Sequence, residues 1–282
     1  MKKLLALLTA MAMCFTLLTA CGGGGETNTE SPDAGGTTET GTTETGTTGE
    51  AGGTFTVGVI GPLTGGAAIY GTAVLNAAQI AVEEINALGG DIQFELLTQD
   101  DVNDPETAVN AYNNLMDDGM QILLGTVTTQ PALAVVPYAY EDRVFTLTPY
   151  GSGDDVIEDN DNVFQVCFTD SNQGSRSAQY IDENFEDAQI AIIYKNDDQY
   201  SQGIRDNFVA EAENRGMSIV YEGTFTEASQ TDFNNQLTAA QSAGADMIFL
   251  PIYYTPASVI LTQANAMGYA PKIGRASCSE RV

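Results

Sequence analysis

Short apolar runs alternate along the chain with longer segments whose apolar residues recur every three or four positions, starting at Thr54. Such short runs are typical of strands buried in a parallel sheet, and the longer segments are typical of helices. The predicted strands are Phe55–Ile60, Ile92–Leu97, Ile122–Leu124, Val144–Leu147, Val163–Phe168, Ile190–Tyr194, Ser218–Tyr221 and Met247–Leu250. The predicted helices are Ala67–Leu88, Pro105–Met116, Pro131–Tyr140, Gln173–Phe185, Gly203–Asn214, Phe233–Ala243 and Ser258–Met267. This order predicts a doubly wound α/β fold with right-handed crossovers.

The alternation starts afresh after Phe168, which divides the folded part into two successive α/β units. We expect a boundary near Asp170, with a first ligand-binding lobe over residues 54–170 and a second, incomplete lobe over residues 171–271.

Two neighbouring strands run straight into turns that carry hydroxyl groups and glycines. Gly125–Thr129 follows the strand Ile122–Leu124, and Thr148–Ser152 follows the strand Val144–Leu147. Ligands of open parallel sheets bind at the carboxyl ends of the strands, and a helix N-terminus there favours an anionic group such as a carboxylate. Two interpretations remain open, because Thr129 could equally cap the following helix and Gly151 could equally shape a turn.

The first twenty residues have the pattern of an export signal. Lys2 and Lys3 precede a short apolar core, Leu4–Leu18, which is too brief for a good membrane span. The sequence Leu-Thr-Ala-Cys, ending at Cys21, resembles the bacterial lipobox, in which the cysteine carries a lipid. We therefore expect a signal peptide over residues 1–20 and a lipid anchor at Cys21. The alternative is an ordinary cleaved signal followed by an accidental cysteine.

The segments that flank the predicted lobes have unusual compositions. Residues 21–53 consist of the lipidated cysteine and a Gly, Thr and Glu linker, which has nothing to bury and should be disordered. Residues 272–282 read KIGRASCSERV, abruptly basic after an acidic chain, and they resemble translated sequencing-adapter DNA. We expect this tail to be non-native and the gene to be truncated.

Charge and the missing residue types exclude several classes of function. The chain has ten Lys and Arg against 38 Asp and Glu, a net charge of −28, which argues against binding nucleic acid or anionic lipid head groups. It contains no histidine, so Ser-His-Asp, Cys-His and HExxH sites are impossible. No P-loop, CxxC pattern or calcium-loop spacing occurs, and Cys167 is most simply a small buried residue. We therefore expect no enzyme activity, no cofactor and no metal site.

Seven segments together resemble the binding proteins of branched-chain amino acid ABC importers, the Leu/Ile/Val-binding type. They are VGVIGPLTGGAAIYG, QDDVNDPETAV, LGTVTTQPA, LTPYGS, FTDSNQG, IAIIYKNDDQYSQG and FLPIYYTPAS, and they span about Phe55 to Tyr269. The resemblance implies the type I periplasmic binding protein fold, with two Rossmann-like lobes and parallel sheets hinged around a cleft. The family's return crossing to the first lobe is missing here.

The resemblance also implies which residues contact the ligand. Thr129, with Thr128 beside it, matches the turn that holds the ligand carboxylate, and the choice between them is uncertain by one position. Gly151 and Ser152 match the second turn. The matching aromatic residues are Tyr70, Tyr200, Tyr253 and Tyr254. Tyr200 could instead pack between loops, and one of Tyr253 and Tyr254 should face away. The family's acidic partner for the ligand ammonium lies on a stretch that this chain does not reach.

The expected function is that of a lipid-anchored, monomeric, extracytoplasmic receptor that delivers a small, aliphatic amino acid to an ABC permease. Same-fold receptors for short amides, urea or aromatic acids are an alternative, as is a ligand sensor with no transport role.

Overall fold

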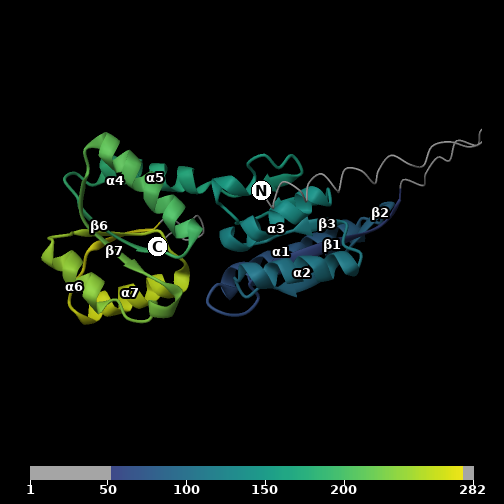
Figure 1. The fold of residues 1–282 in the computed structure, drawn as a ribbon, viewed down its shortest axis with the longest axis horizontal. Helices are drawn as coiled ribbons and strands as arrows, with labels where there is room; N and C mark the ends of the chain where they lie inside the picture. Colours follow the sequence, from purple (N-terminus) through teal and green to yellow (C-terminus); the bar gives the residue numbers. More distant parts are fainter. Residues whose placement is uncertain (1–51, 276–282) are drawn as a thin grey trace, which may run out of the picture. The chain divides into compact units, whose positions relative to one another are not determined.

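The computed structural model describes residues 52–275, which fold around two parallel sheets (Figure 1). The first sheet has the strand order β2-β1-β3-β4-β5. Its strands are β1 (Gly53–Gly61), β2 (Ile92–Asp100), β3 (Ile122–Leu124), β4 (Phe145–Thr148) and β5 (Val163–Gln165). The second sheet has the order β7-β6-β8-β9. Its strands are β6 (Gln189–Lys195), β7 (Ser218–Phe225), β8 (Met247–Leu250) and β9 (Lys272–Arg275).

α-Helices connect successive strands, except between β4 and β5. They are α1 (Ala68–Ala87), α2 (Pro105–Asp117), α3 (Thr129–Glu141), α4 (Asp170–Asn184), α5 (Gln199–Arg215), α6 (Asn234–Ser242) and α7 (Tyr254–Ala266). Short 3-10 turns lie at Asp154–Val156 and Glu227–Ser229. The predicted α/β class with parallel sheets is therefore confirmed. All strand pairs are parallel, as the alternating order requires.

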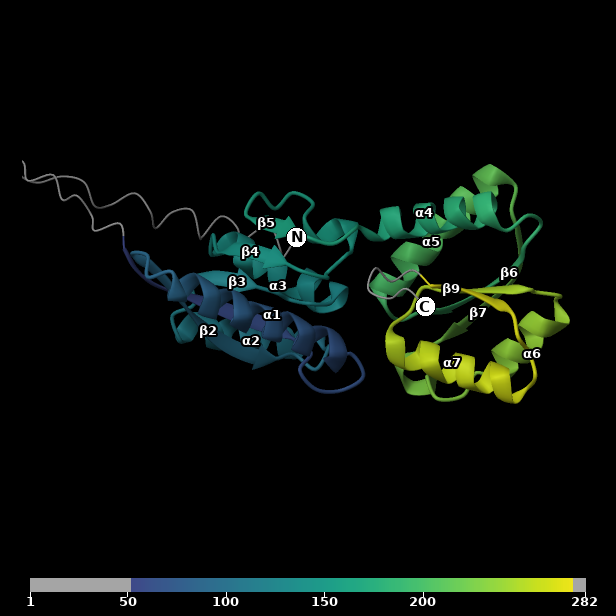
Figure 2. The same ribbon diagram turned by 180° about the vertical axis from the view of Figure 1, so that it is seen from behind.

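The second sheet is covered on both faces, which explains the continuous apolar run in the middle of β6. Ile190 and Ile192 pack under α4 and α5, whereas Ala191 and Ile193 pack under α6 and α7. Figure 2 shows these two helix layers on either side of the strands. Successive side chains of a strand point to opposite faces, so a strand between two helix layers reads as a continuous apolar run.

Helices α2 and α3 cover one face of the first sheet. Their core includes Tyr112, Leu115 and Leu123, all with no exposed surface. Gly125, just after β3, has a backbone φ of +143°, and a Cβ there would lie 2.4 Å from the Ile60 carbonyl oxygen of β1. Only glycine permits this close approach, and it brings the turn after β3 beside the end of β1.

The structure differs from the sequence prediction mainly at element ends. Helix α4 begins at Asp170 instead of Gln173, because Thr169 caps it with a hydroxyl that accepts from the Asn172 amide at 3.3 Å. The strand predicted over Val163–Phe168 ends at Gln165. Strand β9, which pairs with β8, lies where no strand was expected.

Several predictions concern residues that the structure does not describe. The signal peptide, Cys21 and nearly all of the linker lie outside residues 52–275, as do residues 276–282 of the suspected tail. The native or non-native origin of that tail and the lobe boundary near Asp170 stay predictions. Within the described range, each helix is too short or too polar to cross a membrane.

Candidate ligand-binding site

A small cavity of about 40 Å³ lies at the carboxyl ends of several strands. Its lining residues are Tyr70, Val127, Thr128, Tyr150, Ser152, Cys167, Gln173, Tyr200 and Tyr253. Five of the eight residues predicted to bind ligand are among them, and Thr129, Gly151 and Tyr254 are not. This volume has room for a few water molecules, and a whole amino acid requires more space than the cavity offers here.

Thr128 lies at the point where α3 begins. It is the N-cap residue of that helix and is only 3% exposed. Its side chain makes no capping hydrogen bond, and its Oγ1 has no partner among residues 52–275. A buried hydroxyl without a partner costs about 1–3 kcal/mol. The hydroxyl and the positive end of α3 therefore suit a negatively charged ligand group.

Thr129 has a different environment, although it is the next residue. It is the first residue of α3 and is 1% exposed. Its Oγ1 accepts hydrogen bonds from the backbone amides of Ser152 and Gly153, both at 3.2 Å. The hydroxyl thus ties the turn after β4 to α3. The alternative that Thr129 caps the helix is wrong, since Thr128 occupies that position.

Gly151 shapes the turn after β4. Its amide donates to Thr148 Oγ1 at 2.9 Å, and a Cβ at this position would lie 2.6 Å from the same oxygen. Thr148 in turn donates to the Thr126 carbonyl at 2.7 Å, which links the two strand-end turns. The contacts of Gly151 therefore fit the turn-shaping interpretation.

Ser152 connects the cavity to a buried acid that the sequence analysis did not single out. Ser152 Oγ donates to Asp170 Oδ1 at 2.7 Å, and the Asp170 amide donates to the Ser152 carbonyl at 2.8 Å. Asp170 is 2% exposed, and burial raises the pKa of its carboxyl to about 7. In the sequence, Asp170 is recognisable only as an acidic residue between a predicted strand and a predicted helix. Acidic residues are common at helix starts, so this position does not indicate a binding site.

Four tyrosine rings surround the cavity. Tyr253 stacks on Tyr200 with ring centroids 4.8 Å apart, and its ring centroid lies 5.5 Å from that of Tyr70. Tyr70 also contacts Tyr150 at 6.4 Å between centroids. Tyr254 is 44% exposed and contributes its backbone, donating its amide to the Tyr70 hydroxyl at 3.1 Å. Of the two adjacent tyrosines, Tyr253 is therefore the one at the cavity.

A second buried acid lies near the tyrosines. Asp198 precedes α5 and is 3% exposed, and its Oδ2 has no hydrogen-bond partner in the described part of the chain. Burial raises the pKa of Asp198 to about 6, although the charge of Lys195 lowers it. Lys195 itself donates to Glu227 at 2.7 Å. No group of three or more potential metal ligands occurs within residues 52–275.

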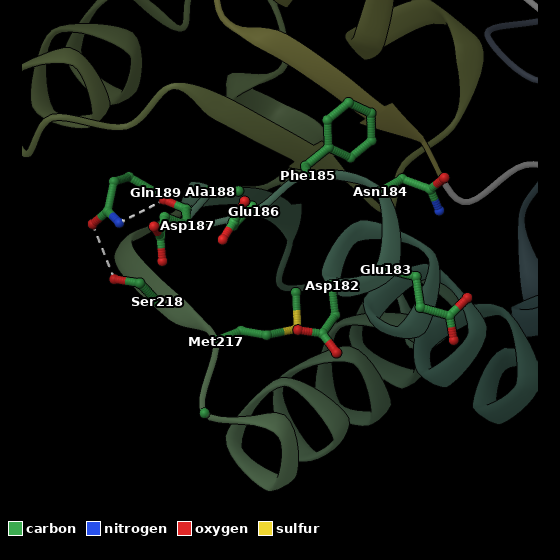
Figure 3. A pocket seen from close by; sticks show the side chains of 11 residues that line it. Asp182, Glu183, Asn184, Phe185, Glu186, Asp187, Ala188, Gln189, Met217 and Ser218 are labelled. Atoms are coloured by element: carbon green, nitrogen blue, oxygen red, sulfur yellow. Dashed lines mark hydrogen bonds between the residues drawn. The ribbon is translucent and has the colours of Figure 1, made fainter.

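A larger hollow of about 600 Å³ lies elsewhere, beside the second sheet (Figure 3). Its lining residues are Asp182, Glu183, Asn184, Phe185, Glu186, Asp187, Ala188, Gln189, Gly216, Met217 and Ser218. Gln189 and Ser218 are the first residues of β6 and β7, so this hollow lies at the amino ends of the strands. Ligands of such sheets bind at the carboxyl ends, so the smaller cavity is the candidate site.

The sequence of the chain is similar to those of known binding proteins. Residues 54–279 match the periplasmic binding protein family. The chain is 33% identical over 217 residues to Leu/Ile/Val-binding protein homolog 3 of Brucella melitensis. It is 30% identical over 223 residues to the leucine-, isoleucine-, valine-, threonine- and alanine-binding protein of Pseudomonas aeruginosa. Each alignment covers 76% of this chain and 58% of the relative, so the chain spans little more than half the length of these proteins.

Solved structures show the same likeness. The leucine-binding protein LivK of Thermotoga maritima superposes with a TM-score of 0.72 at 28% identity, over 78% of this chain and 63% of that protein. The branched-chain amino acid binding protein LivJ of Streptococcus pneumoniae, solved in complex with isoleucine, gives a TM-score of 0.74 at 30% identity, over 79% of this chain and 64% of that protein. These matches confirm the resemblance predicted from the seven segments, and the chain belongs to the periplasmic binding protein family.

Proposed function

We propose that this chain captures a small aliphatic amino acid in the tyrosine-lined cavity and delivers it to an ABC importer. The observation that carries the proposal is the buried, unpartnered hydroxyl of Thr128 at the start of α3, beside Ser152 and the tyrosine rings. Relatives described as Leu/Ile/Val-binding proteins support the choice of ligand.

The ligand carboxylate accepts hydrogen bonds from Thr128 and from the free amides at the start of α3. The rings of Tyr70, Tyr200 and Tyr253 then pack against the aliphatic side chain. A sugar fits less well, because the chain has no tryptophan to stack on it. Groups on the two sheets contribute separately to this site, so the two lobes close around the ligand as a hinge.

Nothing in this arrangement resembles an activated nucleophile, and the proposed role is binding without catalysis. Membership of the periplasmic binding protein family implies a location outside the cytoplasm. We further propose that the protein is a monomer, held at the membrane by a lipid on Cys21 and acting with permease subunits there. Metabolic labelling with a fatty acid should mark the wild type and leave Cys21→Ala unlabelled. Equal labelling of both would refute the lipid anchor.

Isothermal titration calorimetry of the complete protein tests the choice of ligand. The panel contains leucine, isoleucine and valine, together with benzoate, urea and a short amide, which represent the alternative ligand classes. We expect heat only from the amino acids, with the tightest binding to an aliphatic one. Binding of benzoate or urea without any amino acid binding would refute the proposal.

A further inference from the structure

We propose that Asp170 is a positioning residue that holds the hydroxyl proton of Ser152, so that Ser152 offers the cavity a hydrogen-bond acceptor and selects ligands with an N–H donor. This inference rests on the proposed function, since it concerns how the same cavity distinguishes an amino acid from an analogue without the amino group.

The side chains of Ser152 and Asp170 are buried and hydrogen-bonded to each other. Ser152 and Asp170 are each 2% exposed, and the oxygens Ser152 Oγ and Asp170 Oδ1 lie 2.7 Å apart. The backbone bond from the Asp170 amide to the Ser152 carbonyl, 2.8 Å long, holds the same two residues from a second side. Gly203 of α5 leaves room for the acid, because a Cβ there would lie 3.1 Å from Asp170 Oδ2.

The chemistry of the pair fixes the direction of the hydrogen bond. An ionised carboxylate can only accept, so the single hydroxyl hydrogen of Ser152 must point to Asp170. The remaining lone pairs of Ser152 Oγ are then the groups available to the cavity, which Ser152 lines. A ligand N–H finds an acceptor there, whereas a ligand carboxylate oxygen meets lone pairs and is repelled.

Thr128, which also lines the cavity, has the opposite hydrogen-bonding character. Its Oγ1 has no partner among the described residues, so its proton is available to a ligand oxygen, and the start of α3 adds further donors. The cavity is therefore polarised, with donors at Thr128 and acceptors at Ser152. The buried Asp170 maintains this difference without lining the cavity itself.

The test compares leucine with 4-methylpentanoate, which has the same carboxylate and side chain but no amino group. Calorimetry of the complete protein gives the ratio of its affinity for leucine to its affinity for 4-methylpentanoate. The ratio should fall at least about tenfold in Ser152→Ala and in Asp170→Ala, because each variant removes or releases the acceptor. General damage to the site would weaken both compounds equally and leave the ratio unchanged.

Two further variants separate positioning from other effects. Asp154→Ala removes the bonds from the Ser171 amide and hydroxyl at the same helix start, but it keeps the Ser152–Asp170 pair. Because the charge of Asp154 also raises the pKa of Asp170, this variant is compared with the wild type well above pH 7, where Asp170 is ionised in both proteins, and the ratio should then be unchanged. In the Ser152→Ala background, Asp170→Ala should change the ratio no further, because Asp170 acts through Ser152. A further fall in the double variant, or an unchanged ratio in either single variant, would overturn the inference. Wild-type protein that binds neither compound would instead overturn the proposed function, and the inference with it.

A pH series provides a second readout that does not depend on the alanine variant folding. The groups that interact with Asp170 are Ser152 from the turn after β4, Asp154 from the following 3-10 turn and Asp198 just before α5, together with the hydroxyls of Tyr200 and Tyr253. Burial raises the pKa of both tyrosines, so they stay neutral over the pH range of the series. Burial and the charges of Asp154 and Asp198 raise the pKa of Asp170 to about 7, so it becomes ionised as the pH rises through that value. The wild-type ratio should therefore increase over this range, and the isosteric Asp170→Asn should show no such increase. An equal increase in both proteins would overturn the inference.

Discussion

Replacing Thr128 and Thr129 separately by valine tests the site most directly, because the same change in chemistry should have opposite effects at adjacent positions. Valine keeps the shape of threonine and removes only the hydroxyl. At Thr129 the hydroxyl accepts two backbone amides at 3.2 Å, so the change leaves two buried donors unsatisfied. At roughly 1–3 kcal/mol for each donor, with the lower part of the range fitting these long bonds, Thr129→Val should cost about 3 kcal/mol of stability.

The expected shift in melting temperature follows from the size of the folded part. One kcal/mol shifts the Tm of a domain of 150–250 residues by roughly 2–4 °C, so Thr129→Val should melt roughly 6–12 °C lower. Thr128→Val removes a buried hydroxyl with no partner in the described residues, so its Tm should be unchanged or higher. Its affinity for leucine should instead fall at least about tenfold, through loss of a hydrogen bond to a charged group.

Differential scanning calorimetry of the ligand-free proteins and titration calorimetry with leucine measure the two effects separately. The sequence alone predicts Thr129 as the carboxylate contact, with Thr128 one position away, and this pair of variants decides between them. If Thr129→Val kept the wild-type Tm and lost tenfold or more in affinity, the reasoning from the hydrogen bonds would be refuted. A lowered Tm with unchanged affinity in Thr128→Val would refute it equally.

Two further predictions concern the loops that support the site. Gly151→Ala should cost about 1–3 kcal/mol of stability and so lower the Tm, because the added Cβ would lie 2.6 Å from Thr148 Oγ1. Gly90→Ala is the control: a Cβ there meets nothing within 4 Å, and this variant should melt like the wild type. Asp101 has no exposed surface, and burial raises its pKa to about 6 from an ordinary value of 3.8. Because ionisation of this carboxyl opposes folding, the protein should lose stability as the pH rises from 3.8 to about 6. Asp101→Asn should therefore raise the Tm at pH 7 by an amount that shrinks toward pH 4, and a gain independent of pH would contradict this account.

The period of the apolar residues was enough to predict the fold, and local propensity was not enough to place the ends of elements. The run Ile190–Tyr194 could be assigned to a strand covered on both faces, because each of its side chains is apolar and short runs of this kind occur in parallel sheets. Helix α7 begins four residues before the predicted start, because Tyr254, Thr255 and Pro256 give no periodic signal in the sequence. Such a boundary depends on tertiary contacts, here the bond from the Tyr254 amide to Tyr70.

The site could be predicted to within a turn, but not to the individual side chain. The distinction between Thr128 and Thr129 depends on which residue is the first in α3, and a sequence pattern does not fix a helix start to one position. Asp170 could not be identified at all, because its burial depends on α5, which brings Gly203 against it from 33 positions later in the chain. An acid at the start of a helix is ordinarily exposed, and only the packing of a distant segment makes this one part of the site.

The stacked rings of Tyr200 and Tyr253 also make intrinsic tyrosine fluorescence a probe of the cavity. The chain contains twelve tyrosines and no tryptophan, so its ultraviolet emission comes from tyrosine alone, without the energy transfer to indole that usually hides it. Four of those tyrosines line the small cavity, so a ligand bound there changes the surroundings of their rings. Occupancy of the cavity should therefore be readable from the intensity of tyrosine emission in unlabelled protein, with Tyr253→Leu as the variant in which most of that signal is lost.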